Sequence, residues 1–229
     1  MSLYSIGEIY HILAQHARCF WRYTKRMVVI IDYGMGNVGS VKNAFDFLGE
    51  EAIISRKEED IKSASHIVLP GVGAFKKGME NLVSFGLLDI LHHEVLDKKK
   101  PFLGLCLGMQ LLADEGEEGG TTKGLGWVAG KVRKFSTDES KFKIPHVGWN
   151  DVSPQNNSKL FMNISNPVFY FVHSFHFVPD DVSVVAAKTN YGENFVSAVE
   201  KENIFGLQFH PEKSQSAGLE IFTNFLKVK

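Results

Sequence analysis

Two short segments carry the residue types that nucleophilic attack on a carbonyl carbon requires. Cys106 is the centre of the run Gly104-Leu105-Cys106-Leu107-Gly108, which joins an apolar strand-like stretch to a helix-like one. A G-x-C-x-G run at such a junction is typical of a nucleophile elbow, a sharp turn that exposes the central side chain. The flanking glycines remove Cβ atoms that would collide between strand and helix. The N-terminus of a helix at this point favours the thiolate, which is the attacking form of cysteine.

The second segment is Gln208-Phe209-His210-Pro211-Glu212, far along the chain. Residues two apart on an extended chain point to the same side, so Glu212 can contact the His210 ring. Pro211 stiffens the link because its φ is fixed. Such an imidazole can take a thiol proton and return it to a leaving amine, while the carboxylate orients the ring. A cysteine in an apolar strand is most often a core residue, so only the two segments together predict a triad of Cys106, His210 and Glu212.

Elements that could position these residues follow from Met27 onward, where short apolar runs alternate with stretches of helical periodicity. The expected strands are 28–32, 52–55 and 66–70, and the expected helices are about 38–48 and 75–97. Another buried-type strand, 102–105, leads directly into a short helix. This alternation predicts an α/β fold with a mostly parallel sheet covered by helices.

The sequence pattern changes between about residues 124 and 209. Runs of β-branched and aromatic residues at 168–172, 182–187, 195–199 and 204–209 are separated by Asn, Gly and Asp. Such runs predict antiparallel strands, which we expect to be added to the same sheet. A last helix at about 214–227 is expected to close the chain.

Length and composition favour one compact domain. The 229 residues are 44% hydrophobic, enough for one sizeable core, and 25 basic residues balance 26 acidic ones. A net charge of -1 provides no field for nucleic acid or an anionic membrane, so we expect neither partner. No apolar run approaches the roughly 18 residues of a membrane span. Two cysteines, Cys19 and Cys106, are too few for a disulfide framework, and a cytoplasmic location fits best.

Residues 1–26 are interpreted as an extension that precedes a domain of residues 27–229. Apolar side chains at Ile6, Ile9, Leu13 and Ala17 have helix-like spacing, so an appended helix is one interpretation. A mis-assigned start, with Met27 as the true first residue, is the other. A signal peptide is disfavoured because positive charge follows the apolar residues. We assign the segment no catalytic role.

Five further runs extend the pattern beyond the triad: 31–37 (IDYGMGN), 70–75 (PGVGAF), 145–150 (PHVGWN), 170–174 (YFVHS) and 210–214 (HPEKS). With the triad they resemble the class I glutamine amidotransferases, and among these the glutaminase subunits of imidazole glycerol phosphate synthase, over about residues 27–227. The resemblance implies their three-layer, flavodoxin-like fold, with helices on both faces of a mostly parallel sheet and an added antiparallel section.

The same resemblance implies an activity and a partner. L-glutamine would be hydrolysed to glutamate through a thioester on Cys106, without a cofactor or metal. The ammonia would pass to a (β/α)8-barrel cyclase subunit of a heterodimer for histidine biosynthesis, with release of AICAR. We expect the partner and its acceptor to stimulate the glutaminase by reorienting the amides of residues 71–73.

Site residues follow from the resemblance position by position. The backbone amides of Gly73 and Leu107 would bind the oxyanion that develops on the substrate. The implied substrate contacts are Gly71, Gln110, His173 and Ser174, the two last mainly through their backbone. The implied interface with the cyclase comprises Asn37, Trp149, Tyr170 and Lys213. An aromatic residue in a β-rich region is otherwise usually a core residue, and a lysine is usually solvated.

Two hypotheses place the protein in another functional class. The run Gly34-Met35-Gly36-Asn37-Val38-Gly39 spells the G-x-G-x-x-G dinucleotide fingerprint, with Arg56 as a candidate for a 2′-phosphate of NADP. This oxidoreductase hypothesis is weakened because Asp32 and Tyr33 stand between strand and loop, and because it leaves the triad unexplained. His173 and His176 make a weak metal site, since strand residues three apart face opposite sides.

Two more alternatives keep the fold. A non-catalytic scaffold subunit is disfavoured by the intact Cys, His and Glu. A paralogous glutaminase that supplies a synthase amidinating a surface-sugar precursor is the runner-up, because the acceptor would bind on another chain and leave no trace in this one.

Overall fold

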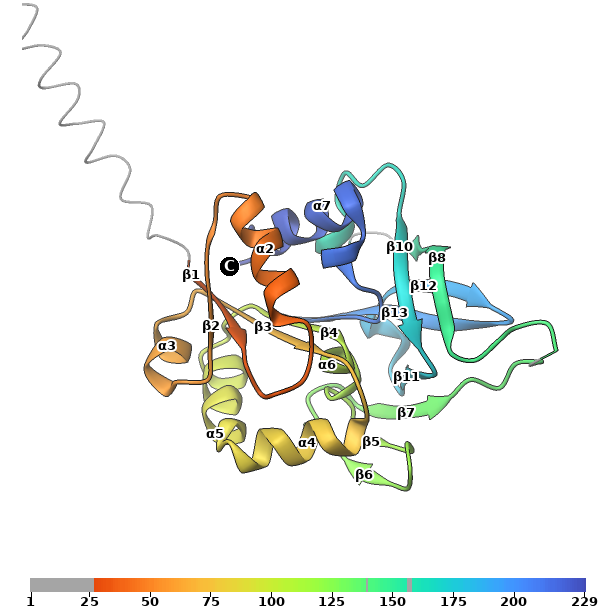
Figure 1. The fold of residues 1–229 in the computed structure, drawn as a ribbon, viewed down its shortest axis with the longest axis horizontal. Coiled ribbons are helices and arrows are strands. Elements are labelled where there is room, and N and C mark those ends of the chain that lie inside the picture. The colour runs from red at the N-terminus through yellow and green to blue at the C-terminus, as the bar shows by residue number, and fades with distance from the viewer. Residues whose placement is uncertain (1–26, 139, 156–157) are drawn as a thin grey trace, which may run out of the picture.

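A single large sheet organises the chain. The computed structural model describes residues 27–138, 140–155 and 158–229, so the helix expected within 1–26 lies outside the described residues. Eight strands run in the order β2-β1-β3-β4-β14-β13-β12-β9 (Figure 1). The first five of these are parallel to one another. Their bounds are β2 (Glu51–Ser55), β1 (Met27–Ile31), β3 (His66–Gly71), β4 (Phe102–Cys106) and β14 (Ile204–Leu207).

The antiparallel section is divided between this sheet and two smaller ones. Three strands extend the main sheet beyond β14: β13 (Glu193–Lys201), β12 (Val185–Tyr191) and β9 (Ser153–Pro154). One separate pair consists of β8 (His146–Asp151) and β10 (Val168–His173), and the last sheet contains β11 (Phe175–Pro179), β7 (Gly130–Lys134), β5 (Glu115–Gly116) and β6 (Thr122–Lys123). The expectation that strand 168–172 joins the main sheet is therefore wrong, because its pairing partner is β8.

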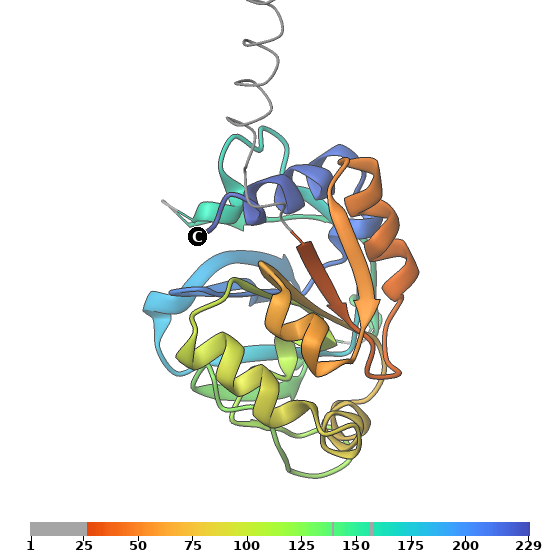
Figure 2. The ribbon, with the colours of Figure 1, turned by 90° about the vertical axis from the view of Figure 1, so that its left-hand side faces the viewer.

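Helices cover both faces of the main sheet, which gives the expected three layers (Figures 1 and 2). On one face lie α2 (Val38–Phe47) and α7 (Gln215–Phe225), whose Phe45 and Phe222 rings are 4.7 Å apart within one core. On the other lie α3 (Glu58–Ser63), α4 (Phe75–Ser84) and α5 (Leu87–His92), which bury Leu82 and Leu91 in a second core. Each such large side chain stabilises the fold by about 1.5–3 kcal/mol when it leaves water.

The long helix expected at 75–97 is interrupted. Gly86 adopts a φ of 67°, in the left-handed region that ends a helix, and separates α4 from α5. The chain then continues as a π-helical turn, η1 (His93–Asp97). Likewise the run expected as a strand at 182–187 begins as a 3-10 turn, η3 (Val182–Val184), before β12.

The strand order brings the distant segments of the sequence together. The central strand β4 has β3 on one side, with Gly71 opposite Cys106, and β14 on the other, with Leu207 opposite Leu105. Because all three are parallel, their carboxyl ends meet at one edge, which is where ligands bind in open α/β sheets.

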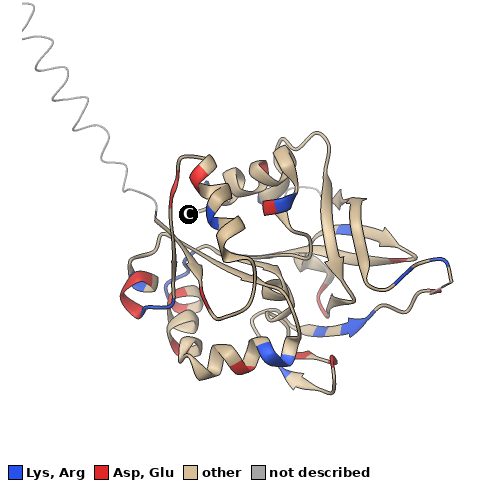
Figure 3. Ribbon diagram, in the orientation of Figure 1, with Lys and Arg blue, Asp and Glu red and all other residues tan. Residues whose placement is uncertain are grey.

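Basic and acidic residues are spread over helices, strands and loops in Figure 3, and the first turn of α3 carries three acidic residues, Glu58, Glu59 and Asp60. Among the described residues, no helix combines the length and the apolar composition needed to cross a bilayer.

Candidate active site

Cys106 occupies the sharp turn between β4 and the short helix α6 (Leu107–Gln110). Its backbone has φ 52° and ψ -104°, a strained conformation that the surrounding packing must hold in place. A Cβ at Gly104 would lie 2.5 Å from the carbonyl oxygen of Gly108, and one at Gly108 would collide with the carbonyl of Leu69. The elbow predicted from the glycines is therefore confirmed in its geometry.

His210 and Glu212 form a buried pair at the end of β14. Nδ1 of His210 lies 2.8 Å from Oε1 of Glu212, and both side chains are 3% exposed. The contact arises differently from the expected extended strand, because Glu212 lies in a 3-10 turn, η4 (Pro211–Lys213), which Pro211 begins. The His210 backbone is fixed by its N–H, which donates to Tyr170 O at 2.8 Å, and by its carbonyl, which accepts from Ser214 Oγ at 2.6 Å.

The electrostatics of His210 favour the imidazolium. Burial lowers its pKa, but interactions with the Cys106 sulfur and the Glu212 carboxylate outweigh burial and raise the pKa to about 10. Nε2 of His210 makes no hydrogen bond to any described residue, so it is available to exchange a proton. The arrangement supports a thiolate–imidazolium pair, with Glu212 as the group that orients the ring.

A cleft of about 330 Å³ opens in front of Cys106. Of the predicted site residues, the structure places Gly73, Cys106, Leu107, Gln110, His173 and Ser174 along this cleft. Leu107 begins α6, where a helix leaves its first N–H groups without intrahelical partners. Gly73 has a φ of 106°, a conformation that suits glycine. The two residues predicted to supply the oxyanion donors thus line the same cleft as the nucleophile.

Gly71 does not line the cleft, and its environment shows why it has no side chain. A Cβ there would collide with the hydroxyl of Tyr33 and lie 2.8 Å from Cβ of Leu107. The Tyr33 hydroxyl is fully buried, and no described residue hydrogen-bonds to it. Burial, reinforced by the charge of Cys106, raises the pKa of Tyr33, so this phenol stays protonated beside the nucleophile.

The side chains of Gln110 and His173 are largely committed to the protein. Nε2 of Gln110 donates to Phe175 O at 2.9 Å and to Oε1 of Gln208 at 3.1 Å, which leaves only its carbonyl oxygen for a substrate. Nδ1 of His173 also contacts Phe175 O at 2.9 Å, and its Nε2 lies 3.0 Å from Nδ1 of His146. The backbone role predicted for His173 is consistent with this commitment.

Sequence reasoning missed Glu118 and Gln208. Glu118 lines the cleft, and its Oε2 accepts from the amide of Phe75 at 2.8 Å. Nothing in the acidic run 114–118 distinguishes this carboxylate from a solvated charge. Gln208 is fully buried with its Nε2 3.6 Å from the Cys106 sulfur. Its signal was present, since Gln208 stands two residues before His210 and therefore on the same side of an extended strand.

Three buried histidines lie near one another: His173, which lines the cleft, His146 and His176. Burial lowers the pKa of His146 and of His176 to about 4, and that of His173 well below the ordinary range. All three are neutral at neutral pH. In the part of the chain that the structure describes, no set of three or more His, Cys, Asp or Glu is placed to hold a metal ion.

Three of the predicted interface residues form one cluster beside the triad. Trp149 and Tyr170 are cross-strand neighbours whose ring centroids are 6.1 Å apart, and Lys213 Nζ lies 5.6 Å from the Tyr170 ring. Trp149 is 48% exposed, an unusual solvent contact for an indole. Asn37, whose interface role stays a prediction, caps α2, with its Oδ1 accepting from Ser40 N at 3.2 Å.

The glycine run 34–39 packs against the protein rather than offering a nucleotide cradle. A Cβ at Gly36 would lie 3.0 Å from the backbone of Pro70, at the end of β3. Arg56, the candidate for a 2′-phosphate, pairs with Asp32 at 2.7 Å and lies 4.3 Å from the Phe85 ring centroid. These contacts favour a structural role for the run and its arginine.

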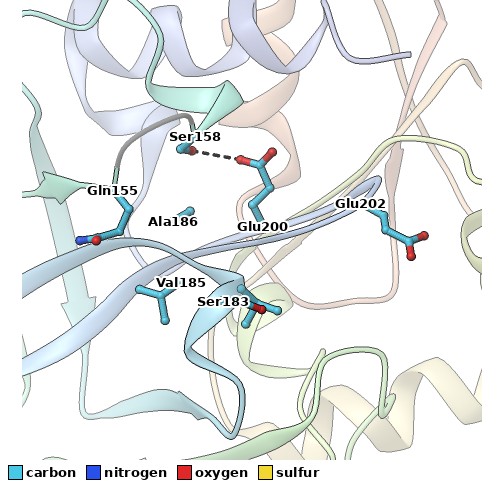
Figure 4. Close-up of a pocket in the computed structure, with 8 residues that line it drawn as sticks. Gln155, Ser158, Ser183, Val185, Ala186, Glu200 and Glu202 are labelled. Atoms are coloured by element: carbon cyan, nitrogen blue, oxygen red, sulfur yellow. Dashed lines mark hydrogen bonds between the residues drawn. The ribbon is translucent and has the colours of Figure 1, made fainter.

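A second hollow of about 250 Å³ lies at the opposite edge of the sheet (Figure 4). Glu200 and Glu202 line it near the turn that precedes β14, level with the start of β4. The Glu200 carboxylate already accepts from Ser158 Oγ at 3.1 Å and from the amide of Lys159 at 3.0 Å. The described residues that line it include no cysteine and no histidine, so this hollow is not the site of the predicted chemistry.

A parallel sheet whose central strand ends in a cysteine elbow, with a buried His–Glu pair after the neighbouring strand, is the arrangement expected of a cysteine-dependent α/β enzyme. The family model for "Glutamine amidotransferase class-I" matches residues 29–228, and the chain belongs to this family. Similar proteins include the imidazole glycerol phosphate synthase subunit HisH of Pelagibacter ubique (strain HTCC1062), 47% identical over 206 residues, with 88% of this chain and 99% of the relative covered. Another is HisH 2 of Methanococcus maripaludis, 50% identical over 202 residues, with coverages of 88% and 99%.

Solved structures support the same fold. A putative GMP synthase subunit from Thermoplasma acidophilum has a TM-score of 0.66 at 20% identity, covering 89% of this chain and 94% of its own. PurLQS from Thermotoga maritima has a TM-score of 0.67 at 22% identity, with coverages of 88% and 98%. At these identities the likeness concerns the fold alone, and it matches the three-layer prediction.

Proposed function

We propose that this chain is the glutaminase subunit of imidazole glycerol phosphate synthase, with residues 27–229 as its catalytic domain. The observation that carries the proposal is the buried His210–Glu212 pair beside Cys106, in a chain 47–50% identical to two HisH subunits over nearly their whole length. A cytoplasmic location suits a nucleophile that must stay reduced.

Hydrolysis proceeds in two halves. The Cys106 thiolate attacks the carboxamide carbon of L-glutamine, and the negative charge that develops on the carbonyl oxygen is bound by the amides of Gly73 and Leu107. One such donor lowers the barrier by about 3 to 4 kcal/mol. The His210 imidazolium gives its proton to the nitrogen as the C–N bond breaks, which releases ammonia and leaves a thioester. Neutral His210 then takes a proton from water, whose oxygen displaces the sulfur as glutamate forms.

Glu118 and Ser174 are suited to hold the amino-acid end of the substrate. The Glu118 carboxylate lines the cleft, where it can pair with the α-ammonium group of glutamine. Ser174 lines the same cleft and can donate to the α-carboxylate. The Gln110 carbonyl remains free to accept a hydrogen bond from the substrate.

Ammonia would leave toward a cyclase subunit with a (β/α)8-barrel fold. The exposed apolar side chains Val72, Val147 and Trp149, which are 42%, 54% and 48% exposed, suit a surface covered by another chain. Val72 belongs to the oxyanion strand 71–73, so a partner that covers it can also bias the amides of that strand. Partner and acceptor binding would thereby raise glutaminase activity.

The test is glutamate release by the purified chain, alone and with the cyclase partner and its nucleotide substrate. We expect strong stimulation by both together. No stimulation would contradict the coupling to this cyclase, and stimulation by a sugar-amidinating synthase instead would favour the paralogous function. Cys106→Ala is the matched control, because it should abolish glutamine-driven synthesis while the complex still uses added ammonia.

A further inference from the structure

Besides the catalytic histidine, the sulfur of Cys106 has two polar neighbours among the described residues: the carbonyl oxygen of Val172, at 3.9 Å, and the side-chain amide of Gln208. Nε2 of Gln208 lies 3.6 Å from Sγ, a hydrogen-bond distance for a sulfur acceptor. Gln208 is fully buried and Cys106 is 5% exposed, so water competes little with this contact. An N–H directed at sulfur favours the charged thiolate over the thiol, because only the thiolate is a strong acceptor.

The orientation of the Gln208 amide follows from its neighbours. The backbone oxygen of Phe175 can only accept, so Gln110 must present its NH2 group there, at 2.9 Å. The same NH2 group has its other hydrogen for Oε1 of Gln208, at 3.1 Å. With its oxygen turned to Gln110, Gln208 must turn its own NH2 group to Cys106.

The chain of contacts continues beyond Phe175. Phe175 O also lies 2.9 Å from Nδ1 of His173, whose Nε2 lies 3.0 Å from Nδ1 of His146. Because Nδ1 of His173 must donate to a carbonyl, its Nε2 is the acceptor, and His146 donates to it. Burial lowers the pKa of both rings and keeps them neutral, which this assignment of protons requires. Phe175 O therefore accepts from both His173 and Gln110, and every proton between β8 and the nucleophile is assigned without conflict.

We propose that Gln208 is the donor that stabilises the Cys106 thiolate, and that Gln110 is the positioning residue that sets the direction of its amide. Gln110 thus acts on the nucleophile before any substrate binds. This inference deepens the proposed glutaminase function, yet it concerns the free thiol and can fail or stand without reference to glutamine or ammonia.

The test is the rate of Cys106 alkylation by iodoacetamide as a function of pH, measured on the full chain without glutamine. Peptide mass spectrometry separates Cys106 from Cys19. Gln208→Met keeps the length and loses the donor. We expect the pH of half-maximal alkylation to rise by about one unit, so that alkylation on the acid limb is about tenfold slower.

Gln110→Met is the second variant, and it acts through Gln208. It should shift the profile in the same direction by less, since the freed amide can adopt either orientation. A Gln110 that only contacted the substrate would change the KM for glutamine and leave the alkylation profile unmoved. Ser197→Ala is the control, because Ser197 is buried, its hydroxyl has no hydrogen bond to the described residues, and its carbonyl accepts from Gln208 N.

An unchanged profile in folded Gln208→Met, with a circular-dichroism spectrum like that of the parent, would overturn the proposal. Should Gln208→Met not fold, the Gln110→Met profile decides: a rise in the half-maximal pH supports the proposal and an unmoved profile refutes it. A shift of equal size in Ser197→Ala would also refute it, since general loosening of this strand would then explain the effect.

Discussion

His210 is buried like His146 and His176, yet its pKa is shifted in the opposite direction. His210 has a pKa raised to about 10, whereas His146 and His176 have pKa values lowered to about 4. All three side chains are nearly inaccessible. The difference is the neighbouring charge: His210 contacts the Glu212 carboxylate at 2.8 Å and its pKa is raised by the Cys106 sulfur, while His146 contacts another neutral ring and an amide. His176 lies 3.8 Å from the Glu193 carboxylate, but the charge of Arg133 lowers its pKa further. Burial alone removes charge, and only a compensating charge retains it.

The largest expected effect on activity comes from removing the predicted nucleophile, Cys106, whose sulfur helps to keep His210 charged. Cys106→Ala should lower glutamine hydrolysis at least about 10⁴-fold, because the remaining triad has no group to form the thioester. Steady-state glutamate release checks this. Cys19→Ala is the control and should retain full activity; activity retained by Cys106→Ala would exclude the assigned nucleophile.

Replacing the Glu212 carboxylate tests whether this neighbouring group keeps His210 charged. Glu212→Gln keeps a hydrogen bond to the ring but removes the negative charge, so we expect glutaminase activity to fall about 10²- to 10⁴-fold. The pKa of His210, measured by NMR, should fall toward its ordinary value. If that pKa stayed near 10, the sulfur alone would account for the charge.

The activity of the parent chain should decline as pH rises through about 10. Above the folded-state pKa of His210 the ring loses its proton and no longer has one to give to the departing ammonia. The measurement is kcat against pH under saturating glutamine. A decline centred near the ordinary histidine value of about 6.5 would contradict the thiolate–imidazolium pair.

The neutral histidines His146 and His176 lead us to expect that the folded protein loses stability in acid. His146 and His176, whose folded-state pKa is lowered, bind a proton near pH 6.5 when unfolded but only near pH 4 when folded. Between these values the unfolded chain binds more protons, so the free energy of unfolding falls as pH falls from about 6.5 to about 4. Urea unfolding at a series of pH values measures it. His176→Phe should flatten this dependence, because both ring nitrogens of His176 lack hydrogen bonds in the described structure and the ring stacks on Phe135 at 4.9 Å.

The smallest effect concerns two tyrosine hydroxyls, one without a partner and one with. Tyr33→Phe removes a buried hydroxyl that has no partner among the described residues, so the free energy of unfolding should stay the same or rise by about 1 kcal/mol. Tyr191→Phe removes a hydroxyl that donates to Lys143 O at 2.9 Å, and this change should lower the free energy of unfolding by about 0.5–1.5 kcal/mol. A larger loss in Tyr33→Phe than in Tyr191→Phe would show that the Tyr33 hydroxyl has a partner.

The two segments of the predicted triad could be identified from sequence because each segment is local. Cys106 lies between its own elbow glycines, and His210 and Glu212 are two residues apart, so short-range rules sufficed. The parallel order of β3 and β4 also follows from alternating strands and helices. The run 204–209 was expected to be antiparallel, and β14 is antiparallel to β13 but parallel to β4. The same local reasoning placed the His210–Glu212 contact on an extended strand, whereas a 3-10 turn makes it.

The remaining features depend on contacts that are distant in sequence. The direction of the Gln208 amide is set by Phe175, on a strand of another sheet, and the separate pairing of β10 with β8 depends on which edge is free. Glu118 reaches the cleft from an acidic run that looks solvated. The break at Gly86 was visible as a glycine, but periodicity on both sides concealed it.

Trapping the covalent intermediate tests the central claim most directly. The chain would be quenched in acid during turnover of glutamine, with the cyclase partner present, and the peptide that contains Cys106 examined by mass spectrometry. We predict a γ-glutamyl thioester on Cys106 that accumulates during turnover and is absent from Cys106→Ala. A γ-glutamyl group on another residue, or glutamate release by Cys106→Ala at the parent rate, would contradict the assignment.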